Sequence, residues 1–134
     1  MLFRSLDLDG MDYWIWNAIR TINPRVVVAE IQSVWRGDAS VTVPYSPDFR
    51  AEFLDGFCLY AGASLPAFVK LGEQKGYRLV GCQRYGFNAF FLRNDVGPEI
   101  FPAIPPEQCF SHPVASWAHD QLLPLVKGRE WQQV

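Results

Sequence analysis

The chain has 134 residues, 49% of them hydrophobic, and a net charge of −2. This composition fits one compact domain, and its slight acidity excludes a broad nucleic-acid surface, which needs a basic face. No apolar run approaches the ~20 residues of a membrane span, and the amino terminus lacks a signal-peptide pattern. We therefore expect a cytoplasmic protein with no nucleic-acid or membrane partner.

The first part of the chain predicts a strand, a helix and a second strand. Residues 2–8 form a short apolar run, and residues 11–22 place apolar side chains at helical spacing. Pro24 ends this helix, because the residue before a proline disfavours helical angles. Residues 25–31 are β-branched with no polar alternation until Glu30, which is typical of a parallel strand covered on both faces. This order is a β-α-β unit with two parallel strands.

The middle of the chain predicts little regular structure. Residues 32–61 have no convincing period, and a stretch of this length is expected to be a loop or a lid. Within it, residues 41–43 can pair briefly as an edge strand, and residues 55–60 can hold a turn of helix. An acceptor pocket lined by this segment is one interpretation, and simple packing onto the sheet is the other.

A helix and a β-hairpin follow this segment. Ser64 can cap a helix that begins at the next residue, and Gly76 is suited to end it. Residues 77–83 and 87–93 read as strands, and their link is so short that they must pair antiparallel. A proline-rich arm begins after these strands, and a final helix is predicted over residues 114–126.

Acidic side chains gather where the first two strands are expected to end. Asp7 and Asp9 alternate along a strand and so point to the same side, and Asp12 lies one helical turn further on. Glu30 and Gln32 follow at the end of the second strand. These acids can bind a substrate and remove its proton, or hold a hard cation. Alternatively, Asp9 caps the helix and Asp12 complements its dipole.

Two segments of the sequence resemble a known family. Residues 6–14, Leu-Asp-Leu-Asp-Gly-Met-Asp-Tyr-Trp, followed by residues 24–30, Pro-Arg-Val-Val-Val-Ala-Glu, are similar to the FkbM-type S-adenosylmethionine-dependent methyltransferases. Residues 81–93 also look like the closing hairpin of that group. The resemblance implies an α/β fold, a partial Rossmann-like methyltransferase sheet in which two parallel strands with a crossover helix precede a helix and an antiparallel hairpin. A carboxyl-terminal helical arm completes this expected fold.

The resemblance also implies an activity. Residues 1–96 would be the carboxyl-terminal half of a methyltransferase-like domain, and residues 97–134 would be the arm and terminal helix. The implied reaction moves a methyl group from S-adenosylmethionine to an oxygen or nitrogen of a small molecule or sugar. The expected catalytic residues are Asp7 and Asp9, and the expected acceptor-binding residues are Asp12, Glu30, Gln32 and Asn88.

The cofactor half of such a site has no counterpart in the sequence. No Gly-x-Gly opens a helix after a strand, so no cofactor-binding residue is assigned and the chain alone is expected to be inactive. The second strand end also lacks the Asp-Asn pair of metal-dependent catechol and caffeoyl-coenzyme-A O-methyltransferases, so we expect no metal site. The competing interpretation is a non-catalytic remnant or split half that acts through assembly, as a homo-oligomer or with a missing amino-terminal half.

Overall fold

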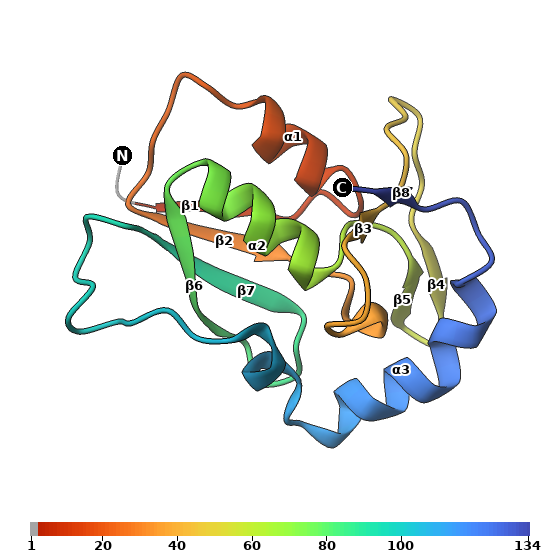
Figure 1. The fold of residues 1–134 in the computed structure, drawn as a ribbon. Helices are drawn as coiled ribbons and strands as arrows, with labels where there is room; N and C mark the ends of the chain where they lie inside the picture. Colours follow the sequence, from red (N-terminus) through yellow and green to blue (C-terminus); the bar gives the residue numbers. More distant parts are fainter. Residues whose placement is uncertain (1–2) are drawn as a thin grey trace.

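The computed structural model describes residues 3–134, and its centre is a four-stranded mixed sheet (Figure 1). The strand order is β1-β2-β7-β6. The strands β1 (Phe3–Leu6) and β2 (Val26–Glu30) are parallel. The strand β7 (Asn88–Arg93) is antiparallel to both of its neighbours, β2 and β6 (Tyr77–Cys82). The predicted α/β class, the parallel pair and the antiparallel hairpin are therefore confirmed.

Two helices cover one face of this sheet (Figure 1). The helix α1 (Asp12–Ala18) joins β1 to β2, and α2 (Leu65–Gln74) precedes β6. Trp16 of α1 packs against both α2 and the sheet. Its ring centroid lies 6.1 Å from that of Phe68 on α2 and 5.3 Å from that of Phe91 on β7. These aromatic side chains belong to the main core, so burial of apolar area holds both helices on the sheet.

The opposite face of the sheet is less covered than the sequence predicted. In β2, Val27 and Ala29 are fully buried beneath the helices, whereas Val26 and Val28 are only half-buried. Phe3, which pairs with Val26, is 56% exposed. The expectation that β2 is buried on both faces is therefore wrong, because a run of valines fits a strand with one solvated face equally well.

The first helix is shorter than predicted and is capped differently. α1 ends at Ala18 rather than at residue 22, and Ile19 is already extended. Side chains take over the carbonyl groups at this end, since Lys75 Nζ donates to Ile19 O at 2.8 Å and Arg20 donates to the carbonyl of Asn17. At the start, the cap is Met11 with no side-chain hydrogen bond, so the interpretation of Asp9 as the cap is wrong.

The segment 32–61 contains four short elements instead of one long loop. They are η1 (Ser33–Trp35), β3 (Val41–Thr42), β4 (Glu52–Leu54) and β5 (Phe57–Tyr60). The expected edge strand at β3 is confirmed, but the expected turn of helix within residues 55–60 is wrong. Asp55 and Gly56 have φ angles of 49° and 82°, which close a β4–β5 hairpin instead.

The carboxyl-terminal segment folds back onto these short elements (Figure 1). It contains η2 (Pro106–Phe110), α3 (Pro113–Val126) and β8 (Gln132–Gln133). Leu122 of α3 and Val34 of η1 share a second apolar cluster, and β8 pairs antiparallel with β3. Within the described residues, no helix is long and apolar enough to cross a membrane. The terminal helix thus forms one wall of the region beyond the end of β2.

Candidate active site

Three acidic side chains meet where the parallel strands β1 and β2 end. One carboxylate oxygen from each of Asp7, Asp9 and Glu30 lies within 4.8 Å of the other two. Asp7 and Asp9 are exposed, and Glu30 is partly buried. Parallel strands finish at the same edge of a sheet, so adjacent β1 and β2 present their terminal side chains together. The predicted convergence of Asp7 and Asp9 holds, and the structure adds Glu30 to it.

The turn between β1 and α1 is held by Asp12. Its side chain is 1% exposed, and its two carboxylate oxygens accept hydrogen bonds from Leu8 N at 3.1 Å and Gly10 N at 3.3 Å. These bonds fix a turn in which Asp9 and Gly10 have φ angles of 49° and 138°. Asp12 therefore positions the exposed acids, and both of its oxygens already have partners.

The electrostatic surroundings of Glu30 perturb its ionisation. Burial raises the pKa of the Glu30 carboxyl to about 7, and the neighbouring carboxylates of Asp7, Asp12 and Asp9 add to this shift. Each of these causes disfavours the charged form of an acid. Both protonation states are populated near neutral pH, which is the condition that a general acid or base requires.

A cavity of about 240 Å³ opens beside Glu30. Its walls come from the end of β2, the β4–β5 hairpin, the start of β7 and α3, through Glu30, Gln32, Phe57, Cys58, Asn88 and Leu122 among others. Asn88 lies directly across from Glu30 in the β2–β7 register. The predicted acceptor residues Glu30, Gln32 and Asn88 are thus brought to one cavity.

Gln32 holds the wall of this cavity together. Its side chain is 3% exposed; Nε2 donates to Ala61 O at 3.3 Å, and Oε1 accepts from Val34 N at 3.3 Å. One side chain thereby joins η1 to the residues that follow β5. Both ends of the amide are occupied, so in this structure Gln32 shapes the cavity through its bonds to the main chain.

The apolar walls were missed by reasoning from sequence. Phe57 and Cys58 come from a hairpin within the segment expected to be a loop, and Leu122 comes from the distant α3. The dipeptide Asp55-Gly56 is a recognised hairpin signal and would have located the first wall. For Leu122, helical spacing shows only that one face of α3 is apolar, and it does not show where that face packs.

In the described residues, the turn after β1 does not offer the amides of Leu8 and Gly10 to a bound nucleotide. The strand-to-helix turn after β1 is where a doubly wound sheet would offer free backbone amides to a nucleotide cofactor. Here the amides of Leu8 and Gly10 are taken by Asp12. The three acids have the oxygen donors that a hard cation prefers, but exposed acids often cluster without one, and the absence of a metal stays a prediction.

Comparison with known proteins adds no assignment to this geometry. No model of a protein family matches the chain, and neither the curated proteins nor the solved structures that were searched contain a match. The functional conclusion therefore depends on the acids, the cavity and the sheet that positions them.

Proposed function

We propose that this chain carries the acceptor-binding part of an S-adenosylmethionine-dependent methyltransferase, which acts on a hydroxyl or amine of a small molecule or sugar. The observation that carries the proposal is Glu30, a carboxyl with a pKa of about 7 that lines a cavity with both polar and apolar walls. A base that must accept a proton near neutral pH needs this kind of environment.

The sheet order supports the same proposal. The antiparallel strand β7 lies between β2 and β6, at the place where the methyltransferase fold is expected to insert its last strand. The candidate base lies at the carboxyl ends of the parallel strands, where open α/β sheets bind their ligands. The strand order and the position of Glu30 both fit this proposal. No residues that would hold the methyl donor are assigned among the described residues.

In the proposed mechanism, Glu30 is the base instead of Asp7 or Asp9. The ionised Glu30 carboxylate accepts a hydrogen bond from the acceptor hydroxyl and takes its proton as the oxygen becomes a nucleophile. Asp7 and Asp9 raise the pKa of Glu30. The Asn88 amide orients the acceptor, whose apolar body contacts Phe57. S-adenosylmethionine would supply the methyl group, and its binding is assigned to polypeptide outside the described residues.

Catechol provides a simple test of acceptor binding. We expect catechol to shift the backbone NMR signals of Glu30, Phe57 and Asn88, and to bind about tenfold more tightly above pH 7 than below pH 6, since a hydrogen bond to a charged group is worth about 1.5–3 kcal/mol. Glu30→Gln should remove this pH dependence, and Glu99→Gln, which changes an exposed carboxylate elsewhere, should keep it. Binding that is unchanged in Glu30→Gln would refute the assignment.

The cofactor is tested separately by calorimetry. We expect S-adenosylmethionine to give no saturable heat with this chain alone, because the turn amides are already engaged by Asp12. Saturable binding would show that the chain, alone or as an oligomer, builds a cofactor site. That result would contradict the proposal that this chain binds the acceptor and not the cofactor.

The second candidate is a non-catalytic protein that acts through assembly. It is favoured by β1, which is an edge strand with one unpaired side in the described sheet. The first residue of this strand, Phe3, also has an exposed ring. Unpaired strand edges readily pair with other chains. Concentration-dependent self-association in sedimentation experiments, together with a failure to bind catechol, would favour this candidate over the enzyme.

A further inference from the structure

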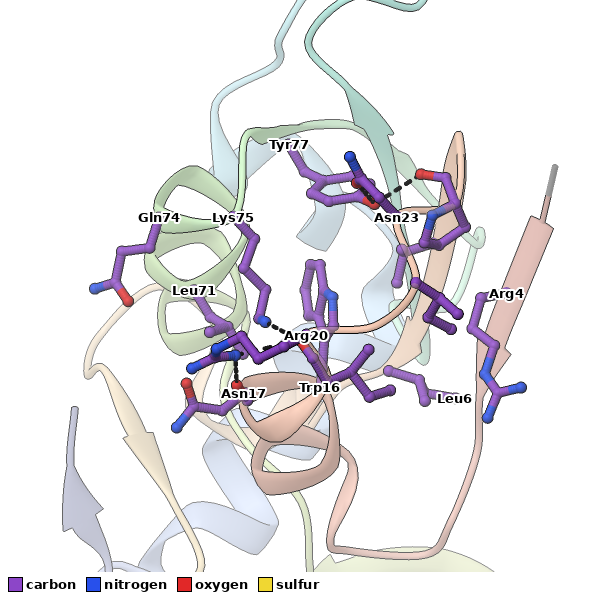
Figure 2. A pocket seen from close by; sticks show the side chains of 14 residues that line it. Arg4, Leu6, Trp16, Asn17, Arg20, Asn23, Leu71, Gln74, Lys75 and Tyr77 are labelled. Carbon is purple, nitrogen blue, oxygen red and sulfur yellow. Dashed lines mark hydrogen bonds between the residues drawn. The ribbon is translucent and has the colours of Figure 1, made fainter. Parts of the chain in front are cut away.

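A second and larger cavity lies between α1 and α2, away from the acidic site (Figure 2). Its volume is about 490 Å³, and it is lined by the carboxyl-terminal ends of both helices, the segment between α1 and β2, and residues of β1, β2 and β6. We propose that this cavity binds a small organic anion, namely an apolar or aromatic body that carries a carboxylate or a phosphate group. This site does not depend on the function proposed for Glu30.

The ionised side chains that line the cavity are all basic. Arg4, Arg20 and Lys75 line it, and no acidic residue among residues 3–134 does so. Arg4 is the second residue of β1, whereas Asp7 and Asp9 follow the last residue of this strand, so the basic side chain precedes the acids along the chain. A concave surface with charges of one sign concentrates ligands of the opposite sign.

Lys75 and Arg20 are fixed near one another but keep free donors. Lys75 Nζ donates to Ile19 O at 2.8 Å, and Arg20 donates to Ile19 O at 3.2 Å and to the carbonyl of Asn17 (Figure 2). An ammonium group has three donors and a guanidinium has five, so several remain for an anion. Burial lowers the pKa of Lys75, and Arg20 lowers it further. The negative charge of a bound anion would offset the repulsion between Lys75 and Arg20.

The rest of the lining suits the body of the ligand. Leu6, Trp16 and Val27 are buried in the main core and form an apolar floor. The Tyr77 hydroxyl lies 2.8 Å from Asn23 Oδ1, which fixes this amide and leaves its nitrogen as a donor (Figure 2). Small-molecule sites typically combine apolar walls with a few converging polar groups, and a volume of roughly 300–1,000 Å³ is usual.

The test compares probes that differ in charge. Indole-3-acetate, phenyl phosphate and the neutral indole-3-acetamide are each titrated into the isotope-labelled chain while backbone NMR signals are recorded. We expect the two anions to shift signals from residues 16–24 and 71–77, and the amide to bind at least about tenfold more weakly, as loss of a charge-assisted hydrogen bond implies. The stronger anion identifies the headgroup as carboxylate or phosphate.

Variants decide whether the cations are responsible. Lys75→Gln and Arg20→Gln should each weaken anion binding about tenfold, while Arg84→Gln, an exposed arginine outside this cavity, should leave it unchanged. The spectrum of each variant shows whether the fold is kept. Equal binding of acid and amide, shifts that map elsewhere, or no binding of either anion at millimolar concentration would overturn the proposal.

Discussion

Replacing Glu30 by Gln is expected to stabilise the protein at alkaline pH. Glu30 has an ordinary pKa of 4.5 when unfolded and about 7 in the folded chain, first because it is buried and then because Asp7, Asp12 and Asp9 lie near it. Ionised Glu30 therefore costs folding free energy, whereas protonated Glu30 does not. Glutamine has nearly the same shape and carries no charge at any pH.

The size and sign of the effect follow from proton linkage. A raised pKa favours the folded state fully below the unfolded value of 4.5, and this contribution is lost as the pH rises through 7. A difference of about 2.5 units corresponds to about 3 kcal/mol of unfolding free energy at 25 °C. Between about pH 5 and pH 8.5, the parent should lose about 2–3 kcal/mol relative to Glu30→Gln.

Urea denaturation of both proteins at several pH values measures this difference directly. Titrating groups that do not interact with Glu30 affect both chains alike, so the difference between the two unfolding free energies reports Glu30 and its coupling to Asp7, Asp9 and Asp12. Glu99→Gln, which neutralises an exposed carboxylate, should follow the parent at every pH. If the curves for the parent and Glu30→Gln stay parallel from acid to alkaline pH, Glu30 does not have the raised pKa on which its role as a base depends.

Two further predictions concern the surroundings of the site. Gly10→Ala should destabilise the fold by about 2 kcal/mol or more, because Gly10 has a φ of 138° and an added Cβ would collide with the ring of Phe49; an unchanged melting temperature would contradict this. Cys58 should react with iodoacetamide far more slowly in the folded chain than in urea at about pH 8, because burial raises its pKa to about 12. Mass spectrometry measures both rates, and equal rates would show that the thiol is not buried.

Local patterns in the sequence were sufficient for the elements that bury one continuous apolar surface. Ser64 was expected to cap α2, and its Oγ accepts a hydrogen bond from Ala67 N at 3.4 Å. Gly76 was expected to end that helix, and its φ is 81°. These features depend on chemistry within a few neighbouring residues. The end of α1 was missed because Lys75, a residue distant in sequence, donates to the carbonyl of Ile19 directly after the helix.

In the candidate site, too, local patterns predicted some features, and others depended on contacts between distant segments. Alternation along the predicted first strand was expected to place Asp7 and Asp9 on one side, but β1 ends at Leu6 and the two acids lie in the turn that follows it. The sequence also assigned the role of base to them and not to Glu30. The pKa of Glu30 is set by burial and by three acids from the turn after β1 and the start of α1, which no local pattern describes. Its cavity also needs the β4–β5 hairpin and α3, whose docking positions are decided by packing.

The sequence by itself determined the α/β class, the parallel first pair, the antiparallel hairpin and the acids at the strand ends, because each depends on short-range periodicity or on short connections. Only the tertiary structure decided which acid is perturbed, what walls surround it, and that Arg4, Arg20 and Lys75 share a cavity. Desolvation and Coulomb interactions depend on distances between segments remote in sequence, and those distances exist only once the chain has folded.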